Sequence, residues 1–213
     1  MRVERTGGPP DLQKAFKYFV LSALRGRSLD DNKDAEAKLG KFPDFSGLRD
    51  LVLLEMKHLE TAQAERLNEA YKKKVKPDEE PIFYGSRSID FESLSNGEDI
   101  RAALASKLSQ TIETQLRKAN QQFGDYRVRN SRKNSVSICV LLNSQLDEFS
   151  PELVAHAIHR KMKGPGGVPR FQHIDGAIYI SEKHFQRLPD GRIAFAIVIY
   201  TGFGAIEQSW KEA

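Results

Sequence analysis

Residues 49–60 read RDLVLLEMKHLE, a run of apolar residues that leads into Glu55, Met56 and Lys57. Such a run is typical of a central β-strand that is buried on both faces. Because successive side chains alternate across a strand, Glu55 and Lys57 are expected to project from the same face as Leu53. The pattern therefore predicts an acid and a lysine side by side at the end of a buried strand.

Packing does not explain the charges of Glu55 and Lys57. Taking a charge out of water is costly unless it is paired or bound to a metal, so folding alone favours Val or Ile at both positions. One alternative is a surface ion pair at the point where the strand emerges, worth about 0–1 kcal/mol. The sequence favours a functional role over this alternative.

A second acid, Asp44, precedes this strand in the segment GKFPDFSGL, where a proline favours extended backbone and a glycine permits a turn. A hairpin is expected to bring Asp44 beside Glu55. The two carboxylates and the main-chain carbonyl of Met56 are hard oxygen ligands of the kind that Mg²⁺ or Mn²⁺ binds. Lys57 would orient an attacking water and offset the negative charge that develops on phosphorus.

Pro43-Asp44, a gap of ten residues and Glu55-x-Lys57 resemble the signature of the PD-(D/E)xK, or restriction-endonuclease-like, nuclease superfamily. The resemblance covers a small part of the chain. It implies an α/β fold with a mixed central β-sheet flanked by helices, and Mg²⁺-dependent hydrolysis of phosphodiester bonds in nucleic acid. DNA is the favoured substrate, with RNA as the alternative. It also implies that Asp44 and Glu55 bind the metal and that Lys57 positions the nucleophile.

The same resemblance suggests two more site residues. Many members carry an acid on a helix before the first strand, and Glu36 is at a fitting place, with Asp34 an equally near candidate. The helix after the ExK strand commonly faces the site, and Gln115 lies on the apolar stripe of a helix expected over 98–123. Gln115 is a candidate for holding a catalytic carboxylate or water, and a core amide with satisfied hydrogen bonds is the alternative.

The rest of the chain predicts an α/β pattern within one domain, 1–213, with a helical or linker insertion at about 58–97. Helices are expected at 11–24, 30–39, about 59–74 and 98–123, and one opens with Ser150 as N-cap and Pro151 as its first residue. Strands are expected at 135–142, 174–180 and 192–201. Strands that alternate with helices favour a partly parallel sheet.

Basic residues outnumber acidic ones, 33 to 29, and the sequence pI is about 9.1. They gather in three clusters that could line a phosphate-binding groove. The candidate nucleic-acid-binding residues are Lys73 and Lys74, then Arg127, Arg129, Arg132 and Lys133, and finally Lys161 and Lys163. The alternative is that these cations lie in solvated loops or complement the dipoles of helix C-termini.

Composition limits the remaining choices. No apolar run approaches the roughly 18 residues that cross a bilayer, so no membrane partner is expected. The single cysteine, Cys139, lies in SVSICVLL and is expected to be a buried core thiol. A cytoplasmic protein is the expectation, and a homodimer or a partner subunit is left open.

Two further classes of function remain beside a metal-dependent nuclease. A catalytically inactive nuclease fold would bind nucleic acid without cleaving it. A protein-interaction module would bind neither metal nor nucleic acid. The three charged residues Asp44, Glu55 and Lys57 favour the nuclease.

Overall fold

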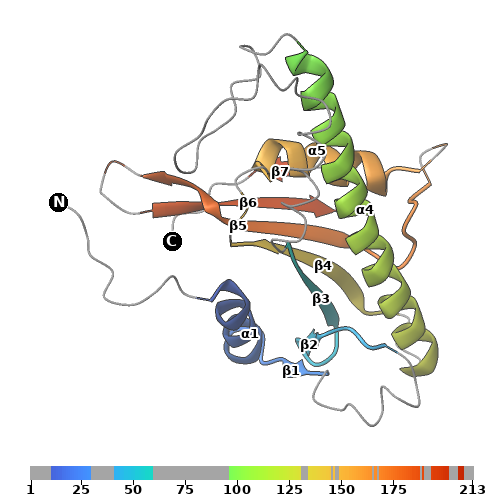
Figure 1. The fold of residues 1–213 in the computed structure, drawn as a ribbon. Helices are drawn as coiled ribbons and strands as arrows, with labels where there is room; N and C mark the ends of the chain where they lie inside the picture. Colours follow the sequence, from blue (N-terminus) through green and yellow to red (C-terminus); the bar gives the residue numbers. More distant parts are fainter. Residues whose placement is uncertain are drawn as a thin grey trace.

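The computed structural model describes residues 11–29, 41–59, 96–130, 134–144, 146, 149–164, 166, 168–187, 189, 193–201 and 206–208. These residues form a seven-stranded mixed sheet with helices packed against it (Figure 1). The expected α/β architecture, a mixed central sheet flanked by helices, is confirmed. The helix expected at 30–39, the one expected at about 59–74 and nearly all of the insertion expected at 58–97 lie outside the described residues.

The strands lie in the sheet in the order in which they occur in the chain. They are β1 (Arg27–Ser28), β2 (Phe45–Gly47), β3 (Val52–His58), β4 (Val136–Asn143), β5 (Gly176–Arg187), β6 (Ile193–Thr201) and β7 (Ile206–Gln208). The three central strands β3, β4 and β5 are parallel, and the other neighbouring pairs are antiparallel. Parallel neighbours need long crossovers, and these contain the helices α4 (Gly97–Asn130) and α5 (Pro151–Met162).

Capping side chains explain where two of the helices begin. The Asp11 carboxylate accepts hydrogen bonds from two main-chain N–H groups in the first turn of α1 (Leu12–Ser22). The Ser150 hydroxyl accepts from the N–H of Leu153, and Pro151 occupies the first turn of α5, as the sequence predicts.

No described helix is both long enough and apolar enough to cross a membrane.

Helix α4 continues through Gly124 to Asn130, seven residues beyond its predicted end. Glycine in a helix interior costs about 1 kcal/mol relative to alanine. Here the missing side chain leaves room for the ring of His173, because a Cβ at position 124 would lie 2.7 Å from its Cδ2 atom. The apolar stripe also continues, since Tyr126 is buried.

Two apolar cores cover the two faces of the sheet. The larger one joins α4 and α5 to the sheet and includes Leu53, Leu116 and Phe123. The smaller one joins α1 to the opposite face and includes Val20 and Leu54. Leu53 and Leu54 therefore point to opposite faces, so the predicted alternation along β3 is confirmed and Glu55 and Lys57 lie on the α4 face.

A left-handed turn precedes β3. The strand begins at Val52, because Leu48, Arg49 and Asp50 all have positive φ angles, of 49°, 57° and 65°. These three residues form the turn between β2 and β3. Three consecutive left-handed residues without a glycine among them are unusual, and the local sequence gives no signal for them.

Candidate active site

Antiparallel pairing of β2 with β3 brings the two acids together. Phe45 pairs with Leu54, so Asp44, one residue earlier, faces Glu55. The main-chain N–H of Asp44 donates to Glu55 Oε2 at 3.1 Å, and Asp44 Oδ2 accepts from the N–H of Met56 at 2.6 Å. The hairpin expected from the sequence is therefore present, and it places Asp44 beside Glu55.

Strand β1 fixes this hairpin in place. The guanidinium of Arg27 donates to both carboxylate oxygens of Asp50 in the turn, at 3.1 and 3.0 Å, and to the Ser46 hydroxyl at 3.2 Å. The N–H of Leu29 donates to the Asp44 carbonyl at 2.8 Å. The backbone that carries Asp44 is thus held from both sides.

Lys57 forms a cluster with Asp44 and Glu55. Its ammonium group contacts Glu55 Oε1 and donates to Gln122 Oε1 at 2.9 Å. The amide of Gln122 in turn donates to the Phe42 carbonyl at 2.9 Å, two residues before Asp44. One glutamine of α4 therefore connects the lysine on β3 to the segment that carries the first acid.

The glutamine at the cluster is Gln122, whereas the sequence suggested Gln115. The two residues are seven positions apart on α4, almost two full turns, so they share a helix face but lie about 10 Å apart along the axis. A glutamine of this helix face therefore contacts the lysine, and it is one that the sequence did not single out. Gln122 lies within the helix predicted at 98–123, and its surroundings are set by the next turn, where Tyr126 is buried and its ring packs edge-on against Phe42.

Burial rules out a surface ion pair. Glu55 is completely buried, and the Lys57 side chain is 18% exposed. A buried carboxylate needs hydrogen-bond donors, and Glu55 has the Lys57 ammonium and the Asp44 N–H. Cys139 lies opposite Glu55 in β4 and is buried as expected. Burial, and then the nearby Glu55 carboxylate, raise the pKa of the Cys139 thiol, so it stays protonated.

Oxygen atoms suited to a divalent metal converge at this point. The N–H and C=O groups of one strand residue point to the same neighbouring strand, so the Met56 carbonyl lies on the side where its N–H meets Asp44. The Asp44 and Glu55 carboxylates and this carbonyl are hard oxygen ligands. Within the described ranges no group of three His, Cys, Asp or Glu side chains could hold a metal. Glu36 lies outside the described residues.

The predicted basic clusters are only partly in view. Lys73, Lys74, Arg132 and Lys133 lie outside the described residues. Arg127 has a structural role that the sequence did not predict, because its guanidinium donates to Asp175 Oδ2 at 2.6 Å and to the Ser135 carbonyl. Asp175 also accepts from the N–H of Ser137 at 2.8 Å. Arg127 thus fixes the end of α4 to β4 and to the loop before β5.

Lys161 also has a partner, since its ammonium donates to Glu113 Oε2 at 2.7 Å. This hydrogen bond joins α5 to α4. In contrast, Lys163 and Arg129 are exposed near the C-terminal ends of α5 and α4. Hydrogen bonds from Lys161, more than any other influence, lower the pKa of the Glu113 carboxyl below its usual value.

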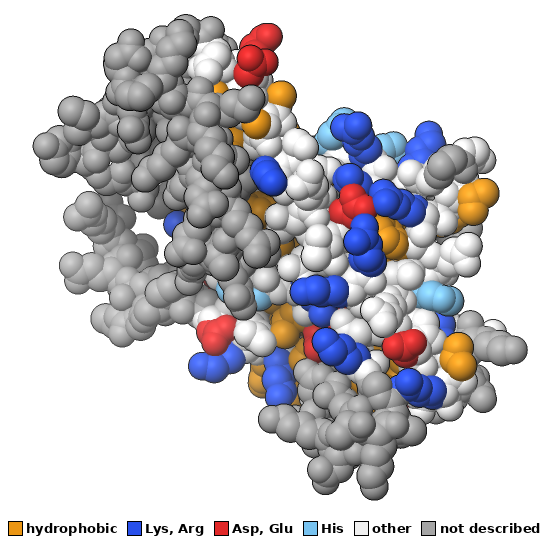
Figure 2. Space-filling model, turned by 45° about the vertical axis from the view of Figure 1, so that its right-hand side comes forward, with side chains coloured by type: hydrophobic (Ala, Val, Ile, Leu, Met, Phe, Trp, Pro, Cys, Tyr) orange, Lys and Arg blue, Asp and Glu red, His pale blue; other side chains and the backbone are white. Residues whose placement is uncertain are grey.

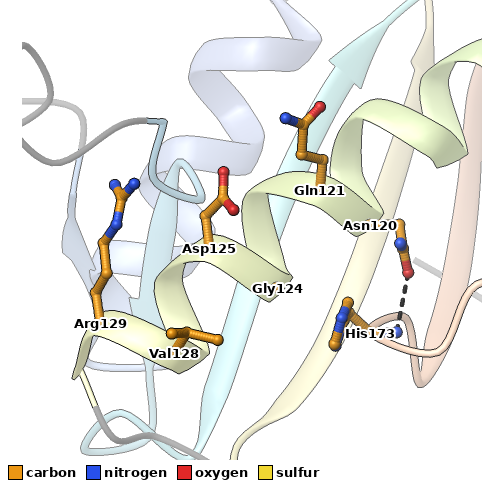
Figure 3. Close-up of a pocket in the computed structure, with 7 residues that line it drawn as sticks. All are labelled: Asn120, Gln121, Gly124, Asp125, Val128, Arg129 and His173. Atoms are coloured by element: carbon orange, nitrogen blue, oxygen red, sulfur yellow. Dashed lines mark hydrogen bonds between the residues drawn. The ribbon is translucent and has the colours of Figure 1, made fainter.

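A shallow depression of about 470 Å³ lies over α4, away from the cluster. Gln121 and Asp125 project from one side of the helix above it and His173 lies on the other side (Figure 3). The lining residues are Asn120, Gln121, Gly124, Asp125, Val128, Arg129 and His173. None of them belongs to the cluster around Glu55, so the depression is not the site of the chemistry that the acids and the lysine suggest.

No family model, no curated protein and no solved structure matches the chain. Any functional assignment therefore rests on the geometry around Asp44, Glu55 and Lys57.

Proposed function

We propose that this chain is a divalent-metal-dependent nuclease that hydrolyses phosphodiester bonds in nucleic acid, DNA in preference to RNA. The proposal is supported by one observation above all, the convergence of Asp44, Glu55 and Lys57 through direct hydrogen bonds on the α4 face of β3. Their order and types are those of the PD-(D/E)xK signature. A cytoplasmic location is part of the same proposal.

The residues present fit Mg²⁺ or Mn²⁺. Asp44, Glu55 and the Met56 carbonyl would hold the ion, because all three supply oxygen atoms and they meet where β2 begins beside β3. When bound, such an ion stabilises negative charge on a phosphoryl oxygen and lowers the pKa of a water molecule.

The other residues of the cluster orient and stabilise. Lys57 carries the positive charge that would hold the attacking water in line and offset the negative charge that grows on phosphorus. Gln122 fixes the Lys57 ammonium from α4, and the same amide fixes the Phe42 carbonyl. The lysine and the Asp44 segment are therefore held in one arrangement before substrate arrives, which reduces the entropy lost on reaching the reactive geometry.

A purely structural role fits the cluster less well. Replacing a buried ion pair by apolar residues of similar volume is often neutral or stabilising, so folding alone does not select Glu55 and Lys57 in a central strand. Their burial is costly, and catalysis supplies a reason for it.

The test is cleavage of supercoiled duplex DNA, linear duplex DNA, single-stranded DNA and RNA by the full chain, with Mg²⁺ or Mn²⁺ and with EDTA. We expect metal-dependent cleavage by wild type and a loss of about a hundredfold or more in Asp44→Asn, Glu55→Gln and Lys57→Met. Lys17→Met and Asp99→Asn, both at exposed positions, are the matched controls and should cleave normally.

Cleavage that persists in all three site variants would contradict the assignment. So would a wild-type protein that cleaves none of the four substrates with either metal. In that second case, binding of nucleic acid without cleavage would favour the inactive nuclease fold instead.

A further inference from the structure

Three cations meet at one acid on the flank of α4 that faces α5. Glu113 Oε1 accepts from Arg117 at 2.8 Å and from Arg170 at 2.7 Å, and Glu113 Oε2 accepts from Lys161 at 2.7 Å. The three cations come from α4, from the end of α5 and from the segment before β5. We call these four residues the Glu113 cluster.

The Glu113 cluster holds more positive charge than a structural contact needs. One carboxylate balances one of its three cations, which leaves a net charge of +2. Arg117 and Arg170 contact the same oxygen atom, so their two terminal nitrogens lie within about 5.5 Å of each other and repel. The Lys161–Glu113 pair alone would join α5 to α4, and both of its side chains are largely buried.

The two arginines present their remaining donors to solvent. The Arg117 side chain is 67% exposed and the Arg170 side chain is 45% exposed. A guanidinium carries five N–H donors in a planar fork, and its contact with Glu113 engages one nitrogen. Two such forks close together on an exposed surface match the several oxygen atoms of a phosphate.

The surroundings favour a polyanion. Figure 2, which brings the right-hand side of Figure 1 forward, shows a face on which Lys and Arg side chains outnumber Asp and Glu side chains. Glu113 and Gln122 are nine residues apart on α4, which is about 14 Å along the axis and half a turn around it. The Glu113 cluster therefore lies on the flank of α4 that faces α5, opposite to the flank that carries Gln122, and it is too far away to contact the phosphate that would be cleaved.

We propose that Arg117, Arg170 and Lys161, organised by Glu113, form a phosphate-binding exosite for the sugar–phosphate backbone of the nucleic acid. The identity of the occupant rests on the proposed nuclease function. The exosite holds a phosphate several nucleotides away from the scissile bond. It contributes to affinity for long substrates and leaves the chemical step unchanged.

The experiment is binding of a fluorescein-labelled 30-base-pair duplex in EDTA, measured by anisotropy over a range of KCl concentrations. We compare wild type with Arg117→Gln/Arg170→Gln, which keeps the Lys161–Glu113 pair. Each phosphate that loses its contact with a protein cation makes the slope of log K against log[salt] shallower by about 0.9. The double variant, which removes the contact with one phosphate, should therefore lose about 0.9 from the slope, and about tenfold in affinity at 0.1 M salt.

Two controls separate a site from overall charge. Lys14→Gln/Lys17→Gln removes the same charge from exposed positions on α1, and it should keep most of the wild-type slope. Arg117→Lys/Arg170→Lys keeps the positive charge and should therefore keep most of the wild-type slope. Inorganic phosphate at 10 mM, with chloride adjusted to constant ionic strength, should leave duplex binding nearly unchanged, whereas strong competition would assign the cluster to a free phosphate and overturn the proposal.

The outcomes are distinct from those that test the nuclease. A wild-type slope in Arg117→Gln/Arg170→Gln, or an equal loss in the α1 control, overturns the exosite even if the protein cleaves DNA. The predicted slopes in a protein that cleaves nothing support the exosite and contradict the nuclease. Where both hold, the arginine variant raises KM for long duplexes and leaves kcat unchanged.

Discussion

Gln122 is the residue through which α4 reaches the proposed chemistry. Its amide oxygen accepts from the Lys57 ammonium and its amide nitrogen donates to the Phe42 carbonyl, both at 2.9 Å. An amide can do both at once, and neither a carboxylate nor an apolar side chain of that size can. Gln122 is therefore a positioning residue, which holds Lys57 and the segment before Asp44 at a fixed separation.

Replacing Gln122 should lower turnover more than binding. In Gln122→Leu the ammonium of Lys57 loses its anchor on α4, so we expect kcat to fall about tenfold or more while KM changes little. Gln115→Leu, at the partly buried position two turns earlier on the same helix face, is the matched control and should keep wild-type kcat. Steady-state kinetics on duplex DNA with Mg²⁺ measures both. Equal losses in the two variants would show that α4 packing, not the amide, matters.

The β2–β3 hairpin shows how backbone strain can lie next to a candidate site. Leu48, Arg49 and Asp50 have φ values of 49°, 57° and 65°, a left-handed conformation that costs a residue with a Cβ about 1–2 kcal/mol. The Arg27–Asp50 ion pair and the hydrogen bond from the Leu48 N–H to the Leu24 carbonyl hold the turn. The strain is sustained because tertiary contacts determine the conformation.

Glycine at position 49 should relieve part of this strain. Arg49 is exposed and has φ 57°, so Arg49→Gly removes the steric cost without removing the contacts of Asp50. We expect the free energy of unfolding to rise by about 0.5–1 kcal/mol after the extra chain entropy of glycine is subtracted. Urea unfolding compares this variant with Arg49→Ala, which keeps a Cβ and should gain little. A gain of the same size in both would mean that the arginine side chain, not the backbone, is the source.

At the scale of elements, contacts that are local in the chain could be predicted from the sequence. The alternation along β3, the cap at Ser150 and the pairing that sets Asp44 against Glu55 each depend on residues close in sequence. The contact between Lys57 and α4 does not depend on residues close in sequence. Gln122 is 65 residues away from Lys57, and only the packing of the helix selects it over Gln115.

The basic residues show the same division. Arg127 and Lys161 look like surface cations in the sequence, yet their acidic partners Asp175 and Glu113 are each 48 residues away and come into contact only when the elements pack. Arg117 and Arg170 meet through Glu113 for the same reason. Sequence patterns reveal where charge accumulates, and the fold decides which charges are neutralised.

At the scale of the whole molecule, the buried Glu55–Lys57 ion pair lowers stability, and the proposed function explains why it is retained. Glu55 is fully buried in β3, between β2 and the parallel strand β4, and the cation that balances it is mostly buried too. Desolvating two charges costs free energy that their attraction repays only in part. If catalysis retains the pair, its removal as a unit should leave the fold intact.

The free energy of unfolding of three variants tests this balance. Lys57→Met leaves the buried Glu55 carboxylate without its cation and should cost about 3–5 kcal/mol. Glu55→Leu should cost less, because the Lys57 side chain is 18% exposed and its ammonium can reach water. Glu55→Leu/Lys57→Met should return to within about 1 kcal/mol of wild type or exceed it, while all three variants lose cleavage. Urea unfolding and the cleavage assay are run on the same preparations. A double variant as unstable as Lys57→Met would show instead that the fold itself needs the ion pair, and the case for retention by catalysis would fail.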